Sequence, residues 1–91
     1  KAFEDLGVSA YNGAGRLLAS DTYLTLAGKI VSVEARHAAV IRDLLAPKTP
    51  AFAGDDVVAV ATGLDAQRSP SQVLAIASHY ITTSINRGDL P

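Results

Sequence analysis

A long helical stripe in the first half of the sequence is the feature that most limits what this chain can fold into. Its members recur every three or four residues, the period of an α-helix with one apolar face: Leu26, Ile30, Val33, His37, Ile41 and Leu44. Ser20 and Asp21 precede the stripe as favoured N-cap residues, and Pro47 cannot continue the helix. The sequence therefore predicts an amphipathic helix that ends at Leu45.

A second helical pattern precedes it, from Ala2 to Leu18, with apolar residues again at three- and four-residue steps. Gly7, Gly13 and Gly15 lie within this pattern, and each glycine weakens an isolated helix by about 1 kcal/mol relative to alanine. Closely packed neighbours must therefore hold the segment. Because the link between the two patterns is short, we expect residues 1–45 to form an antiparallel helical hairpin.

The remaining residues, 46–91, are predicted to form a C-terminal extension. Prolines and glycines surround one apolar run, residues 57–61, whose three valines fit either a short strand or a packed loop. Ser69 followed by Pro70 is an N-cap with proline at the first helical position. We therefore expect a short helix at about residues 70–85.

Composition excludes several kinds of chemistry and partner. The sequence has no cysteine, so any metal site must use oxygen and imidazole ligands. Its eight lysines and arginines are scattered and the net charge is -1, which argues against nucleic acid as a partner. The longest uncharged stretch contains Pro70, Gln72 and His79, so we expect no membrane insertion. There is also no methionine, and we expect a processed or partial chain.

Glu34 and His37 form a Glu-x-x-His motif, which places a carboxylate and an imidazole on one face of the second helix. Such a motif also arises by chance, as a half-exposed glutamate beside a histidine at the edge of a core. Glu4 lies about 16 residues before a turn near Ser20, and Glu34 and His37 lie about 13 and 16 residues after it. With a rise of about 1.5 Å per residue, all three side chains can converge in an antiparallel hairpin.

Other polar residues have simpler interpretations. Glu4 would also suit the first turn of a helix, where the dipole favours acids. Tyr11 fits an ordinary core tyrosine better than a residue bordering a site. Arg36 and Arg42 are expected at the surface, solvated or paired, and His79 is expected to be structural because no acidic residue lies near it in sequence.

Two blocks of the sequence, residues 3–14 (FEDLGVSAYNGA) and residues 30–39 (IVSVEARHAA), resemble the ferritin-like domain family that includes plant and bacterial desiccation-related proteins. Residues 64–75 are similar to the C-terminal tail of that family. The resemblance implies an all-α fold, in which the two blocks are the third and fourth helices of a four-helix bundle. It also implies that Glu4, Glu34 and His37 are ligands of a di-iron or di-manganese site.

The same resemblance implies that this chain holds half of such a bundle. The first two helices, with their own Glu and Glu-x-x-His ligands, have no counterpart in the sequence. The expected partner is the missing N-terminal half, a second copy of the chain, or another protein chain. We expect an oxidase, peroxide or metal-handling role. A non-catalytic structural or desiccation-associated bundle without metal is the alternative, because a fold is inferred more readily than an activity.

Overall fold

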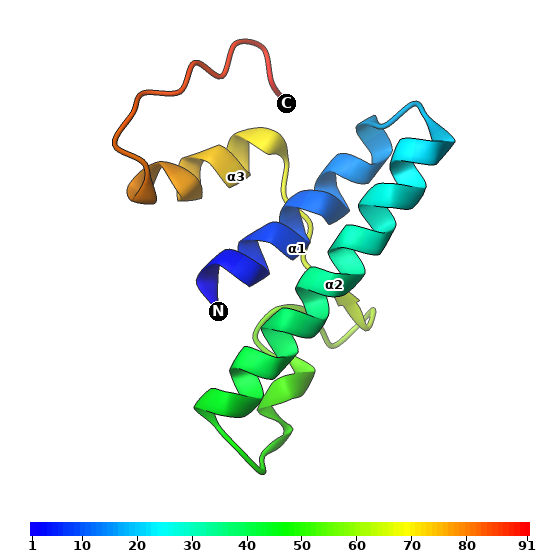
Figure 1. Cartoon of the computed structure of the whole chain (residues 1–91), viewed down its shortest axis with the longest axis vertical. Helices are drawn as coiled ribbons and strands as arrows, with labels where there is room; N and C mark the ends of the chain where they lie inside the picture. Colours follow the sequence, from blue (N-terminus) through cyan, green and yellow to red (C-terminus); the bar gives the residue numbers. More distant parts are fainter.

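The computed structural model describes residues 1–91 and is mostly helical, with a small two-stranded sheet (Figure 1). In chain order its elements are α1 (Ala2–Ala14), η1 (Gly15–Leu17), α2 (Asp21–Leu45), η2 (Pro50–Ala53), β1 (Val58–Ala59), β2 (Leu64–Asp65), α3 (Pro70–Ala77) and η3 (Ser78–Tyr80). Here η denotes a 3₁₀-helix. None of the helices combines the length and the apolar character needed to cross a membrane.

Helices α1 and α2 lie side by side and antiparallel, joined by a short link (Figure 1). The Ser20 hydroxyl accepts a hydrogen bond from the backbone N–H of Tyr23 at 3.3 Å, which caps α2 where the sequence predicts its start. Helix α2 ends at Leu45, also as predicted. Helix α1 is shorter than predicted, because its last turn tightens into η1 at Gly15, among the glycines that weaken it.

An extended segment before α3 crosses the outside of α1 and holds it. The backbone N–H of Arg68 donates to the Ser9 carbonyl at 2.9 Å, and its guanidinium donates to the Ser9 hydroxyl at 2.8 Å. The Asn12 amide donates to the Ala66 carbonyl at 3.2 Å. Gly13 allows this contact, because a Cβ there would overlap the backbone of Arg68. Gly13 therefore acts through close packing.

The run at residues 57–61 contributes a short strand, which was one of the two expected alternatives. Strand β1 pairs antiparallel with β2, with Val58 opposite Asp65 and Ala59 opposite Leu64. Gly63 turns the chain in the left-handed region, at φ 68°. This hairpin lies beside α1 and projects from the pair of long helices (Figure 1).

Helix α3 begins as predicted, with a capping box. The Ser69 hydroxyl accepts from the Gln72 N–H at 3.3 Å, and the Gln72 side chain accepts from the Ser69 N–H at 2.9 Å. The predicted end near Ile85 is wrong: α3 stops at Ala77, and η3 continues only to Tyr80. Ile81 is extended and begins a run of β-branched residues, which favour extended backbone over helix. The Tyr80 ring then packs against the Phe3 ring of α1, with ring centroids 4.8 Å apart.

Little of this structure is buried, with 6 of 91 residues inside. The apolar stripe of α2 is largely uncovered. Its exposed members, with their exposed fractions, are Leu26 (49%), Ile30 (42%), Val33 (38%) and Leu44 (75%). An amphipathic helix buries its apolar face when it is part of a complete domain. The hairpin therefore has one closed side, against the loop and the crossing segment, and one open side.

Candidate metal centre

The structure brings the three predicted site residues together. Glu4 comes from α1, and Glu34 and His37 come from successive turns of α2. Each offers one ligand atom, and these atoms all lie within 4.8 Å of one another. His37 Nδ1 is 3.7 Å from Glu4 Oε2 and 3.8 Å from Glu34 Oε2. The helical rise and the short link therefore predicted their convergence correctly.

One oxygen of this cluster has no partner. Glu4 Oε2 is buried and makes no hydrogen bond, although the Glu4 side chain as a whole is 25% exposed. A carboxylate oxygen removed from water without a donor or a cation is unfavourable. His37 Nδ1 lies 3.7 Å from this oxygen, beyond hydrogen-bond distance. The Glu4 carboxylate is thus placed for a cation or a proton that would satisfy it.

The pKa of Glu34 also reflects the closeness of the two carboxylates. Three effects raise the pKa of Glu34: a hydrogen bond that its protonated form would donate to Glu4, partial removal from water, and the negative charge of Glu4. His37 acts in the opposite direction. When no cation is bound, the nearby Glu4 therefore favours the protonated form of Glu34. A bound metal ion would replace that proton.

The donor set fits iron or manganese, since carboxylate oxygen and imidazole nitrogen are ligands that both metals accept. Di-metal carboxylate bundles take a glutamate from each of two helices and a Glu-x-x-His pair from each of the other two. Here α1 carries the single glutamate, and α2 carries the pair. The chain thus presents one helix of each kind.

Comparison with protein families gives one match. Residues 1–47, more than half of the 91-residue chain, match the sequence profile of the ferritin-like domain. The chain therefore belongs to the ferritin-like domain family. The matched region contains α1, η1 and α2, and with them all three candidate ligands. Residues 48–91, which include residues 64–75, lie outside it. Searches of curated proteins and of solved structures gave no match.

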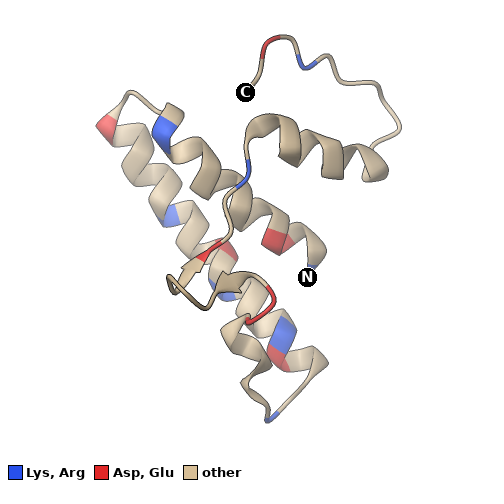
Figure 2. Cartoon of the chain, turned by 180° about the vertical axis from the view of Figure 1, so that it is seen from behind, with Lys and Arg blue, Asp and Glu red and all other residues tan.

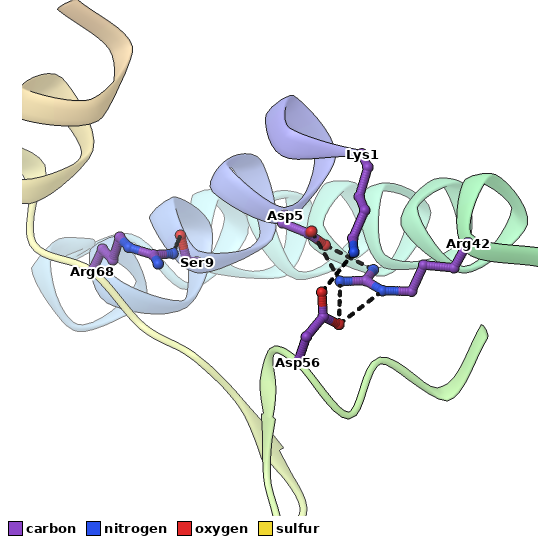
Figure 3. A network of polar contacts seen from close by, with 6 residues as sticks. All are labelled: Lys1, Asp5, Ser9, Arg42, Asp56 and Arg68. Atoms are coloured by element: carbon purple, nitrogen blue, oxygen red, sulfur yellow. Dashed lines mark hydrogen bonds and ion pairs between the residues drawn. The ribbon is translucent and has the colours of Figure 1, made fainter. Parts of the chain in front are cut away.

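A second polar cluster, centred on Arg42, was not predicted (Figure 3). Arg42 was expected at the surface, but its side chain is only 5% exposed. Its Nη2 donates a hydrogen bond to Asp5 Oδ2 at 2.9 Å, and its Nη1 forms an ion pair with Asp5 Oδ1 at 2.8 Å. It also donates to Asp56 Oδ1, from Nε at 3.1 Å and from Nη2 at 2.9 Å. Lys1 Nζ lies 2.7 Å from the other Asp56 oxygen. The arginine lies inside because the loop after η2 folds over it.

The ionisation of this second cluster is mutually supported. Burial alone would lower the pKa of Arg42, but hydrogen bonds and charges from Asp5 and Asp56 outweigh it and raise that pKa. Lys1 and then Arg42 lower the pKa of Asp56. A sequence signal was available: Arg42 follows Ala35, Ala38 and Ala39, and small residues mark the side of a helix that a neighbour can approach closely.

The other singled-out residues lie outside both clusters. Arg36 is exposed and donates to the Ser32 hydroxyl at 2.8 Å, in agreement with a surface position. Tyr11 is half-buried on α1, and His79 is exposed in η3. Positions of lysine and arginine are dispersed along the helices and loops, among those of aspartate and glutamate (Figure 2).

Proposed function

We propose that this chain supplies half of a di-metal carboxylate site in a ferritin-like four-helix bundle, with Glu4, Glu34 and His37 as ligands of iron or manganese. The observation that carries the proposal is the buried, unpartnered Oε2 of Glu4, which faces an imidazole nitrogen and a second carboxylate. Membership of the ferritin-like family supports it. The desiccation-related type remains part of the proposal.

Each residue has a distinct role in the proposed site. Glu34 would be the bridging carboxylate, because His37, its neighbour on the same face of α2, would bind one metal beside it. His37 binds through Nδ1, the nitrogen nearest both carboxylates, and must be neutral to do so. Glu4 joins α1 to the site. A bound pair of iron or manganese ions would supply electron-transfer chemistry with dioxygen or peroxide.

The open side of the hairpin supports the second part of the proposal, that another helical hairpin covers it. The uncovered stripe of α2 includes Leu26, Ile30 and Val33, and each apolar side chain of this size contributes about 1.5 to 3 kcal/mol when fully buried. The covering hairpin would bring its own Glu and Glu-x-x-His. We propose the missing N-terminal half for this place, with a second copy or a separate chain as alternatives.

A metal-free structural or stress-associated bundle is the second candidate function. The raised pKa of Glu34 favours it, because a proton shared with Glu4 satisfies the buried oxygen without metal. On this reading the cluster is a remnant of a metal site. The protein's role would then depend on its surface.

Metal content separates the two candidates. The native assembly should be loaded with ferrous iron or manganese, freed of unbound metal and analysed for metal per chain. We expect the wild type to retain metal, and Glu34→Ala and His37→Ala to lose most of it. His79→Ala is the matched control, since it removes an exposed histidine far along the chain, and it should retain metal as the wild type does.

A different result would support the metal-free bundle. If the wild type retains neither metal while Glu34→Ala raises the melting temperature, the metal-free bundle is correct. Native mass of the assembly then identifies the covering half. A mass of two chains indicates a second copy, and a larger or mixed mass indicates a different partner.

A further inference from the structure

The two polar clusters are joined through neighbouring residues of α1. Glu4 belongs to the candidate metal centre, and Asp5, the next residue, belongs to the cluster of Arg42. On α2, Arg42 lies five positions after His37 (42 minus 37). Both clusters therefore connect the first turns of α1 to the same part of α2.

We propose that Arg42 is a positioning residue for the metal centre, acting through Asp5 on Glu4. This inference rests on the proposed function. The guanidinium contacts both oxygens of Asp5, through a hydrogen bond from Nη2 at 2.9 Å and an ion pair from Nη1 at 2.8 Å. Such a pair fixes direction as well as distance. It sets the rotation and the axial level of α1 relative to α2, and so the position of Glu4.

The first turns of α1 need such support. Gly7, three residues after Glu4, lowers the stability of the helix at this level. A Cβ at Gly7 would meet no atom within 4 Å, so nothing packs against that position of α1. Metal ligands must be held to within about 0.5 Å of their productive positions. Arg42, almost fully buried, supplies a rigid contact next to Glu4.

Arg42 also neutralises the acid next to Glu4 in the chain. Both Asp5 oxygens lie against the guanidinium. The cluster of Lys1, Arg42, Asp5 and Asp56 balances two positive against two negative charges. It therefore adds no net negative charge beside the metal centre.

Manganese affinity tests this role, measured in the native assembly from the electron paramagnetic resonance signal of free Mn²⁺. Arg42→Met removes the charge, and Arg42→Lys keeps it but loses the paired contacts. We expect each to weaken Mn²⁺ binding by about 10-fold or more, the size found when residues that support metal ligands are removed. Asp5→Asn should act in the same direction, and it carries the test if Arg42→Met does not fold.

Arg68→Met is the matched control, because it removes another arginine that bonds to α1, at Ser9. It should lower the melting temperature of the metal-free protein but change Mn²⁺ affinity by less than about threefold. The double variant Arg42→Met with Asp5→Leu replaces the ion pair by apolar side chains. It should recover melting temperature without recovering affinity, because stability and position are then separated.

Three results would overturn the inference: unchanged Mn²⁺ affinity in Arg42→Met, recovered affinity in the double variant, or an equal loss in Arg68→Met. In each case Arg42 serves stability alone. A wild type that binds no Mn²⁺ or Fe²⁺ is a different failure. It removes the proposed metal function, and the positioning role with it.

Discussion

Glu4 and Asp5 are adjacent acids on α1, and the structure gives them opposite surroundings. Both Asp5 oxygens lie against the Arg42 guanidinium, one through a hydrogen bond and the other through an ion pair, and Arg42 also binds Asp56 (Figure 3). One oxygen of Glu4 is buried with no donor, and the nearest residues are Glu34 and His37. One acid is thus satisfied within the chain, and the other is not.

The difference teaches which cluster is structural. A buried ion pair with its hydrogen bonds made belongs to the fold and needs nothing further. Two carboxylates close together without a cation are unfavourable unless a proton or metal intervenes. The cluster of Arg42 lies on the closed side of the hairpin. The cluster of Glu4, Glu34 and His37 lies apart from it and has an oxygen without a partner, so it is the cluster that a proton or a metal ion would stabilise.

Removing Arg42 should have the largest effect on stability. Arg42→Met leaves the Asp5 carboxylate, 16% exposed, without a cation, and breaking a buried pair by removing one partner costs about 3 kcal/mol or more. His37→Ala is the control, because that side chain is 56% exposed, and it should change the free energy of unfolding by about 0.5 kcal/mol or less. Denaturant unfolding of the metal-free assembly measures both. If both variants lose the same free energy of unfolding, the two clusters do not differ in their contribution to stability.

Two glycines of α1 extend the comparison to packing. Gly13→Ala should destabilise the protein by about 2 kcal/mol, since the added Cβ displaces the backbone of Arg68. Gly7→Ala should stabilise it by about 0.5 to 1 kcal/mol, because a Cβ there meets no atom within 4 Å and alanine favours helix. Thermal unfolding distinguishes the two signs. A loss of stability in Gly7→Ala would instead indicate that the proposed covering half packs against that turn of α1.

Glu34→Gln should give a smaller effect whose sign depends on metal. Because the pKa of Glu34 is raised, the folded metal-free protein holds its proton to higher pH than the unfolded chain does. Stability therefore falls as pH rises from the ordinary value of about 4.3 through the raised pKa. At pH 7 the metal-free variant should melt above the wild type, and near pH 4 the difference should vanish. With manganese bound, the wild type should melt above Glu34→Gln. If metal-free Glu34→Gln melts below the metal-free wild type at pH 7, the prediction is wrong.

The smallest effect concerns acid stability at Asp56. Lys1 and Arg42 lower its pKa, so its contribution is complete above the ordinary value of about 3.9 and is lost as pH falls through the lowered value. Asp56→Asn should therefore flatten the fall of melting temperature below about pH 4. Asp55→Asn, its exposed neighbour, is the control. If the melting temperatures of the two variants fall equally below about pH 4, the ion pairs of Asp56 do not contribute to stability in solution.

Local signals in the sequence were enough for the frame of the site. Helical period and the caps at Ser20 and Ser69 fix where α2 and α3 begin, because a cap depends on residues three positions apart. The convergence of Glu4 with Glu34 and His37 follows from helical rise and a short link, which are also local quantities. That is why the candidate site was predictable before its surroundings were.

Only the tertiary structure decided the closed side of the hairpin. Arg42 meets Asp5 across 37 positions and Asp56 across 14, and its own helix gives no sign of either partner. The glycines of α1 predicted closely packed neighbours, but not that Arg68 is the neighbour at Gly13. The physical reason is the same in both cases. Small residues on a helix indicate that a neighbour can approach closely, but the distant segment that folds over them is decided by the tertiary structure, and helical periodicity does not identify it.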